Sequence, residues 1–497
     1  LAAARYFEQT GDEELAGVLS THYRAAYEAS DEGPEADALQ VQARLSLRAA
    51  ADRAISLGSS GQALAYLREA LDLSTEPADR GPLLELAAHA ADLEGDEEDA
   101  VALGRRSVET FQAAGDRDGA ARATIQLSQI LIDAGFAEEV VALLSESIAD
   151  TVEPAVRARM LANLSRAHYR DGNVAESVRV ADEALALAEP QGLDGVIAET
   201  LVNKGSALAG RRVVEPAILL RAAIEMASEL GDVDSELRAR SNLAVLQSLD
   251  DLPAAIRGWT EVRGVAERIG VRSIAEWAVG SLSWGYLERG EDWDAALAHI
   301  EESMSLVRSE SSRGFLHGSA EQILLLRGED ERAEREARES ALGAFEGSEF
   351  DAWFLHHPGW KLLLAGSYRE AFDSLQAIIP RLRQVKLFGR HGMVGAAAWA
   401  RDEELARAAL AETQVEPYSG GVYRAVGTLA EGSVLALGAD AAGARERLLE
   451  AERRIRGTGW EWWTALVRLS AMFLLPDDPV IAAWEPLVRS RLEACLL

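Results

Sequence analysis

The segment Gly95-Asp96-Glu97-Glu98-Asp99-Ala100 decides the fold of this chain, because its pattern of a Gly followed five residues later by a small or apolar residue recurs along the sequence. The glycines that open such segments are Gly11, Gly58, Gly95, Gly135, Gly172, Gly290, Gly328 and Gly366. Within 58–172 and within 290–366 these glycines are 37 to 40 residues apart. A nearly constant period of this length is typical of a solenoid of structural repeats.

Each period divides into two helical stretches around its Gly. Ahead of Gly172, side chains that can face a core recur every four residues, at Val156, Met160, Leu164 and His168. A Gly can adopt the left-handed conformation that ends a helix, and an Asp, Ser or Asn after it can cap the next helix. Each period is therefore predicted to be one helical hairpin.

A hairpin of this length cannot bury its own apolar face, so neighbouring hairpins must stack around a continuous core. We therefore predict an all-α, right-handed superhelical solenoid of about eleven or twelve hairpins. Gly366 and Gly438 are 72 residues apart, which leaves space for one weak repeat near Arg401-Asp402.

The repeats resemble the tetratricopeptide repeat (TPR) family. Gly58, Ala63 and Ala70 stand where that motif places its turn Gly and its small second-helix residues, and Gly366 with Ala371 matches in the same way. The period here is longer than the usual 34 residues of the family, and the Trp, Leu-Gly and Tyr signature of its first helix is poorly kept. The resemblance implies divergent TPR-like hairpins.

A narrower resemblance covers about the first 75 residues. The stretches HYRAAY at 22–27, AAADRA at 49–54 and QALAYL at 62–67 look like a junction found in large bacterial signalling proteins. Those proteins join an adenylate/guanylate cyclase domain and a AAA-type or STAND-type ATPase to a C-terminal TPR region. The resemblance implies that this chain is such a C-terminal region. The cyclase and nucleotide-binding motifs are not in this sequence, so neither activity is assigned to a residue here.

Composition excludes several function classes. The chain has 497 residues, and 82 acidic against 50 basic side chains give a net charge of -32, which disfavours direct binding to nucleic acid. The single cysteine, Cys495, excludes an internal disulfide framework. No apolar run reaches the roughly 20 residues that cross a bilayer. We expect a cytoplasmic chain with no membrane contact, no metal and no cofactor.

Tryptophan divides the chain. All 11 Trp residues lie at or after Trp259, and the earlier part is built from Ala, Leu and Val. We predict three regions: a helical hairpin and junction at 1–38, a regular solenoid at 39–250 and a divergent Trp-rich solenoid at 251–497. The indoles are predicted to fill gaps between divergent hairpins. The alternative is an aromatic concave surface that binds a peptide or ligand.

The most unusual segment is WFLHHPGWK at 353–361. Pro358 removes a backbone donor and is predicted to kink its helix, and two imidazoles between indoles suggest a pocket. The candidate groove for a partner or ligand consists of Trp353, His356, His357, Trp360 and Lys361. A structural kinked helix is the competing interpretation. Adjacent His residues do not share a helix face, so a two-His metal site is not expected.

A basic cluster interrupts the acidic background at Arg381, Arg383, Lys386, Arg390 and His391. One interpretation is an exposed helix that balances acidic neighbours. The other is a patch that docks an acidic partner segment or a nucleotide.

The sequence contains no phosphate loop, zinc-binding His-Glu-x2-His helix or Gly-x-Ser-x-Gly nucleophile elbow. The leading hypothesis is a non-enzymatic interaction and sensor module that binds a protein or peptide, or an upstream effector domain. Its runner-up is the sensor region of a LuxR-family or related STAND transcription regulator. A third hypothesis is a helical-repeat enzyme with an active site near His356, His357 and Trp360. The partner's identity and the oligomeric state stay open.

Overall fold

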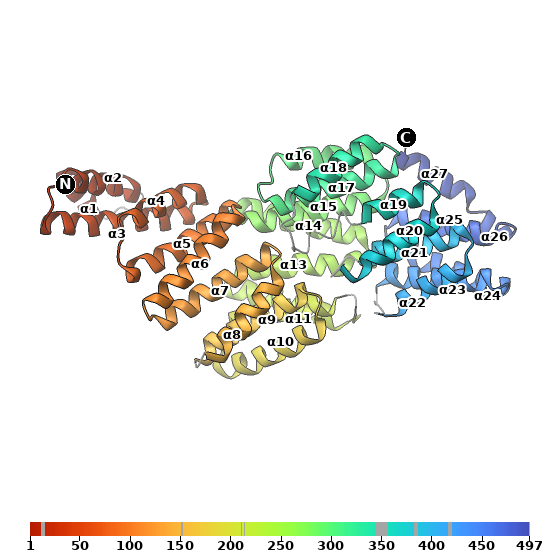
Figure 1. Cartoon of the computed structure of the whole chain (residues 1–497), viewed down its shortest axis with the longest axis horizontal. Helices are drawn as coiled ribbons and strands as arrows, with labels where there is room; N and C mark the ends of the chain where they lie inside the picture. Colours follow the sequence, from red (N-terminus) through yellow and green to blue (C-terminus); the bar gives the residue numbers. More distant parts are fainter. Residues whose placement is uncertain are drawn as a thin grey trace.

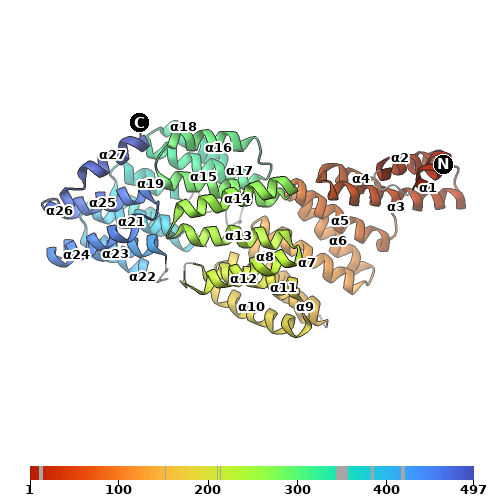
Figure 2. The ribbon, with the colours of Figure 1, turned by 180° about the vertical axis from the view of Figure 1, so that it is seen from behind.

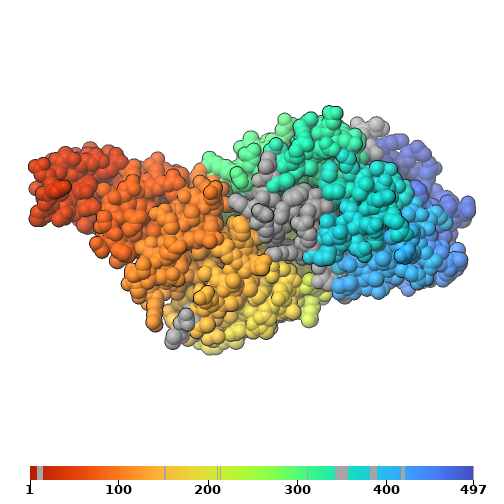
Figure 3. All heavy atoms as spheres, viewed as in Figure 1, coloured from red at the N-terminus to blue at the C-terminus, as the bar shows by residue number. Residues whose placement is uncertain are grey.

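The structure, a computed structural model, describes residues 1–10, 15–150, 153–209, 211–212, 214–342, 356–381, 386–415 and 420–496. These residues form helices and turns without a strand. The array is elongated, with α1 at one end and α22 to α27 at the other (Figures 1 and 2). Figure 3 shows a narrow red end and a much bulkier green-to-blue end.

The helices up to residue 248 begin and end as follows: α1 (Ala2–Thr10), α2 (Ala16–Glu28), α3 (Pro34–Ser56), α4 (Ser60–Asp72), α5 (Pro77–Glu94), α6 (Glu97–Ala113), α7 (Arg117–Asp133), α8 (Ala137–Asp150), α9 (Pro154–Arg170), α10 (Val174–Ala188), the short 3-10 helix η2 (Glu189–Gln191), α11 (Asp194–Leu208), α12 (Glu215–Leu230) and α13 (Val233–Ser248).

The remaining helices are α14 (Leu252–Ile269), α15 (Arg272–Arg289), α16 (Trp293–Met304), α17 (Glu310–Leu326), α18 (Asp330–Leu342), α19 (His357–Leu364), α20 (Tyr368–Ile378), η4 (Ile379–Arg381), α21 (Lys386–Ala400), α22 (Glu403–Val415), α23 (Gly421–Leu437), α24 (Ala441–Ile455), α25 (Glu461–Leu474), α26 (Pro479–Ala482) and α27 (Glu485–Leu496). None of the described helices is both long and apolar enough to span a membrane.

Consecutive pairs from α3/α4 to α23/α24 pack as hairpins, and α25 packs on α27. The predicted all-α solenoid of stacked hairpins is therefore confirmed. Odd-numbered helices from α5 to α25 also contact the next odd-numbered helix, so they form an inner layer. The even-numbered helices form the outer layer of the solenoid.

The repeat glycines end the first helix of each hairpin as predicted. Gly58, Gly95, Gly135, Gly172, Gly290, Gly328 and Gly366 all have φ between 60° and 89°, whereas Gly11 lies outside the described residues. The following polar residue caps the second helix in several hairpins; Asp292, for example, accepts a hydrogen bond from the amide of Ala295 at 2.9 Å. In the weak repeat Arg401 itself adopts the left-handed conformation, with φ of 53°.

A second set of left-handed glycines joins one hairpin to the next. Gly115, Gly192, Gly231 and Gly270 have φ between 63° and 82°. The last three are 39 residues apart and thus share the repeat period. Ala120 and Ala275 follow Gly115 and Gly270 at the same five-residue distance, whereas Ile197 and Glu236 stand at that distance after Gly192 and Gly231. The sequence therefore contained this signal, but sequence reasoning did not identify it.

The solenoid contacts itself after one superhelical turn. The Arg272 guanidinium on α15 donates to the carbonyl of Glu94 at 3.3 Å, and Arg308 forms an ion pair with Glu94. The Ser309 hydroxyl donates to Glu97 at 2.6 Å. These contacts join the α5/α6 turn to α15 and to the start of α17, so the hairpins between them enclose an interior.

A second closure joins the end of α13 to the C-terminal hairpins. The amide of Leu252 donates to the carbonyl of Thr458 at 2.8 Å, and the amide of Val422 donates to the carbonyl of Leu249 at 3.2 Å. Near the chain end, the Cys495 thiol donates to the carbonyl of Gly290 at 2.9 Å. One large core cluster therefore extends from α13 to the residues of α27.

Candidate binding sites

A pocket lies between α15, α17, α19 and α25, and three residues of the predicted candidate groove line it. About 460 Å³ of space lies within it, part of it open to solvent. The residues that line this indole pocket are Leu287, Glu288, Glu321, Gln322, Leu325, Leu326, His356, His357, Trp360, Trp462 and Trp463.

Two of the predicted residues do not line the indole pocket. Lys361 is exposed, and its ammonium group pairs with Glu334 at 2.6 Å. Trp353 lies outside the described residues. Pro358 occupies the first turn of α19, where a missing N–H costs nothing, so it begins this helix and does not kink it.

Glu288 supplies the first buried carboxyl of the indole pocket. It is the penultimate residue of α15 and is 1% exposed. The Trp463 indole donates a hydrogen bond to it. Burial raises the pKa of Glu288 to about 8, because hydrogen bonds from neutral indoles only partly replace the lost water. The carboxyl is therefore mostly protonated at pH 7.

Glu321 and His357 form the second polar pair of this pocket. Glu321, on α17, is 3% exposed, and the His357 Nδ1 atom lies in hydrogen-bond contact with one of its oxygens. Burial raises the pKa of Glu321, while the bond from His357 partly offsets this effect. Glu321 therefore has an imidazole as its hydrogen-bond partner, whereas the partner of Glu288 is an indole.

The indole walls come from a turn that only glycine allows. Gly457 and Gly459 have φ of 86° and 84° and direct the chain back into the core at Trp460. A Cβ on Gly459 would lie 2.4 Å from the Cδ atom of Pro253. Trp462 then packs against Trp293, with ring centroids 4.9 Å apart. The two closures of the fold thus position the pocket's aromatic wall.

Sequence reasoning found the His and Trp of α19 but missed Glu288, Glu321, Trp462 and Trp463. Glu288 stands two residues before a turn Gly, where an acid is usually solvated. Glu321 stands beside the apolar run Ile323-Leu324-Leu325-Leu326, which was a signal for a buried acid. Trp462 and Trp463 reach the pocket only through the second closure, which no local pattern encodes.

The basic cluster does not form one exposed patch. Arg390 is 3% exposed and pairs with Glu412 at 3.1 Å. His391 is 2% exposed, packs on Trp463 with ring centroids 4.0 Å apart, and burial lowers its pKa to about 3. Arg383 lies outside the described residues, as do the side chains of Arg381 and Lys386. The apolar core that surrounds Arg390 and His391 keeps both from an anionic partner in solution.

The indole pocket can bind a ligand or hold a proton, but its described lining includes no Ser, Thr, Cys or Lys that could act as a nucleophile. Within the described part of the chain, no three His, Cys, Asp or Glu side chains are grouped to hold a metal ion. The chemistry present is therefore two carboxyls, two imidazoles and three indole rings.

A second, larger hollow lies on the inner layer of the first superhelical turn. It has about 840 Å³ of space, which includes open solvent. The residues that line this inner groove are Glu85, His89, Arg122, Ile125, Gln126, Gln129, Arg159, Gly195, Val196, Glu199 and Asp232. They come from α5, α7, α9, α11 and the start of α13, so consecutive repeats each contribute to it.

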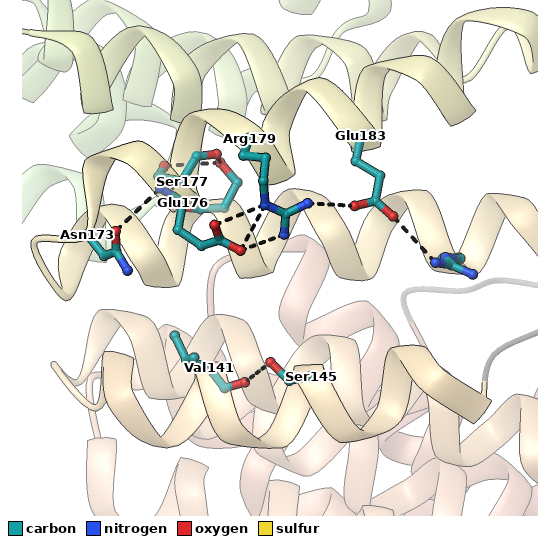
Figure 4. Close-up of polar contacts among 9 residues, drawn as sticks. Val141, Ser145, Asn173, Glu176, Ser177, Arg179 and Glu183 are labelled. Carbon is teal, nitrogen blue, oxygen red and sulfur yellow. Dashed lines mark hydrogen bonds and ion pairs between the residues drawn. The ribbon is translucent and has the colours of Figure 1, made fainter.

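The inner groove carries charges of both signs. Arg122 pairs with Glu85 through two hydrogen bonds of 2.9 and 3.1 Å, and Arg166 pairs with Asp133 next to it. Burial, followed by repulsion from Asp133, raises the pKa of Asp92 to about 7. On the outer layer, Arg179 of α10 pairs with Glu176 of the same helix (Figure 4), and Arg105 of α6 pairs with Glu139 of the next outer helix, α8.

Amide side chains join the first helices that line the groove. The amide of Gln126 donates to the carbonyl of Glu85 at 3.0 Å, that of Asn163 to Ile125 at 3.2 Å, and that of Asn203 to Ala162 at 2.9 Å. The three donors are 37 and 40 residues apart, which is the repeat period. This amide ladder fixes the spacing of the inner helices and so the width of the groove. Sequence reasoning did not identify it.

No family model and no curated protein matches the chain. Among solved structures, a STAND protein with a tetratricopeptide repeat sensor from Pyrococcus horikoshii is 14% identical, with a TM-score of 0.38; the match covers 89% of this chain and 55% of that protein. The chain thus spans little more than half of that relative's length.

Two further solved structures are similar. The quorum sensor NprR of B. thuringiensis is 15% identical over 61% of this chain and 83% of its own, with a TM-score of 0.40. The Cut9–Hcn1 assembly of the APC/C is 13% identical over 91% of this chain and 96% of the matched one, with a TM-score of 0.32. Similarities this low assign no ligand or partner to the chain.

Proposed function

We propose that the chain is a non-enzymatic interaction module that holds an extended segment of a partner protein in the inner groove. The observation that carries this proposal is the lining of the groove by five consecutive inner helices. A solenoid presents such a surface to a chain that runs across its repeats. The amide ladder supports the proposal, because a preorganised groove loses little conformational entropy when a partner binds.

The charge pattern favours a partner with both acidic and basic side chains. Arg122 and Arg159 offer guanidinium groups, while Glu85 and Glu199 offer carboxylates. A polyanion such as nucleic acid would meet these carboxylates in a chain of net charge -32. We therefore propose neither nucleic acid nor a membrane as a partner of this groove. We expect the module to act in the cytoplasm.

We further propose that the module is the sensor arm of a multidomain signalling protein. The support is the resemblance of 22–27, 49–54 and 62–67 to the junction that follows a cyclase and ATPase. The first closure gives the coupling element, because a groove occupant would alter the separation of Glu94 and Arg308 and so favour one curvature. Reading the gene upstream of Leu1 tests this context.

To test the groove as a binding site, peptides that bind the purified chain are selected from a library, and their affinities for the original chain and for variants are compared. Arg159→Glu reverses an exposed charge inside the groove, and we expect it to weaken the selected peptides about tenfold or more. Arg221→Glu makes the same change on the exposed side of outer helix α12 and should leave affinity unchanged. Equal affinities for both variants would place the peptide site elsewhere.

A further inference from the structure

The indole pocket combines two features that the inner groove lacks, and it is separate from the groove. Its carboxyls are almost completely buried, at 1% exposure for Glu288 and 3% for Glu321. Its walls include the three indoles of Trp360, Trp462 and Trp463. Neither Lys nor Arg is among the described residues that line it.

A buried carboxyl is costly unless a cation or several hydrogen bonds accompany it. Glu321 shares a hydrogen bond with the His357 imidazole. The indole that donates to Glu288 is neutral and leaves the charge of an ionised Glu288 uncompensated. Indole faces attract cations through the ring quadrupole, and the attraction is strongest where water is excluded.

We propose that the indole pocket binds an organic cation, whose ammonium or guanidinium group packs on the indole faces and is neutralised by the carboxylate of Glu288. The proposal does not depend on the inner groove or on any partner bound there. Glu288 makes the charged contact, whereas Glu321 and His357 contribute a hydrogen-bonded pair to the lining of the same pocket.

Cation binding is coupled to a proton. Glu288 has a pKa of about 8 in the free protein, so at pH 7 its carboxyl proton must leave to solvent as the cation enters. Affinity should therefore rise between pH 6 and pH 8. The other titratable groups near Glu288 are Glu321 on α17, His356 and His357 on α19, and His391 on α21, which packs on Trp463.

The test compares ligands of one shape that differ in charge. Calorimetric titration of the intact chain uses choline and its uncharged isostere 3,3-dimethylbutan-1-ol. We expect choline to bind about tenfold tighter or more, with roughly one proton released at pH 7 when two buffers are compared. N-acetyl-arginine amide is the third probe and represents the side chain of a partner protein.

The probes separate the sources of the cation. Binding of choline supports a free metabolite, and binding of the arginine amide alone supports a partner's side chain. Failure of both cations to bind, or measurable binding of choline with the same affinity as its isostere, would overturn the proposal.

Variants locate the site. Glu288→Gln keeps the shape and an oxygen for the Trp463 indole, and it should reduce cation affinity at least about tenfold while leaving affinity for the isostere unchanged. Glu276→Gln is the matched control, because Glu276 is also buried on α15. Its carboxylate lies outside the pocket and accepts hydrogen bonds from the backbone amides of Arg308 and Ser309. If Glu288→Gln misfolds, the isostere comparison and the proton release still decide.

Discussion

The two halves of the chain solve the same packing problem with different side chains. Up to α13 the core consists of several separate clusters, of which the larger two run from Leu47 to Ile130 and from Val108 to Ala184. From Ala244 to Cys495 one large cluster includes Trp259, Trp293, Trp460, Trp462 and Trp463, with small separate clusters around Val262 and Leu324 beside it. Hairpins of small residues therefore stack as nearly independent units, whereas indoles bridge hairpins that are distant in sequence.

The polar connections show the same difference. In the first half the amide ladder joins α5 to α7, α7 to α9 and α9 to α11, which are direct neighbours in the inner layer. In the second half, the Trp460 indole donates to the carbonyl of Ser248 at 2.5 Å, across 212 residues of chain. The first half should behave as a one-dimensional repeat array, and the second half as a cooperative globular domain.

The largest expected effect comes from Trp460→Ala. Trp460 is 0% exposed, and its ring lies 5.3 Å from that of Trp284 and 5.7 Å from that of Trp463, centroid to centroid. The loss of its packing should cost about 3–5 kcal/mol. Because every Trp lies at or after Trp259, fluorescence reports only the second half during urea unfolding.

We expect the fluorescence midpoint of Trp460→Ala to fall sharply, while a far-UV circular dichroism transition from the first half persists near its original midpoint. Trp277→Ala is the control, since Trp277 is 38% exposed and should cost under about 1 kcal/mol. Parallel shifts of both signals by the same amount would show that the halves unfold as one unit.

The next effect concerns pH. Glu288 is neutral when folded up to about pH 8 but ionises near its ordinary pKa of 4.5 when unfolded. The folded state then binds the extra proton, so this group's contribution to stability is lost as pH rises towards 8. Glu288→Gln removes that loss. Relative to the original chain, the free energy of unfolding of this variant should rise by about 2 kcal/mol between pH 6 and pH 8. Urea unfolding followed by Trp fluorescence measures it, and identical pH dependences would contradict it.

Asn203→Ala tests the first half with a smaller effect. The amide group of Asn203 donates to Ala162, and its oxygen accepts from Arg238 at 3.1 Å, so it joins three inner helices. We expect a cost of about 1–3 kcal/mol. Hydrogen exchange should accelerate in α9, α11 and α13 but not beyond α15. Spread of the faster exchange to α25 would contradict the independence of the repeats.

The sequence predicted the features that depend on a local pattern. It did not predict the features that depend on contacts between hairpins distant in the sequence. The turn glycines, the hairpins and the capping residues follow from a period that can be read along the chain, and even Arg401 was located as a weak repeat. His356, His357 and Trp360 were found because their segment is unusual. The pocket that they line needs Glu288 and Trp463, which are 175 residues apart. The superhelical return that joins these two residues depends on small rotations accumulated over many hairpins.

The smallest predicted effect uses a turn in which the repeat has lost its glycine. Gly438 has φ of -81°, and its neighbour Ala439 takes the left-handed position instead, with φ of 65°. An L-residue there costs roughly 1–2 kcal/mol, and the greater freedom of Gly in the unfolded chain offsets part of this cost. Ala439→Gly should therefore raise the stability of the second half by about 0.5–1 kcal/mol. Because Ala439 is exposed, the substitution removes no buried packing.

Gly366→Ala makes the opposite change at a regular turn with φ of 82° and should lower the stability by about 1 kcal/mol. Opposite shifts of the fluorescence midpoint are expected, and shifts of the same sign would show that backbone strain does not govern these turns.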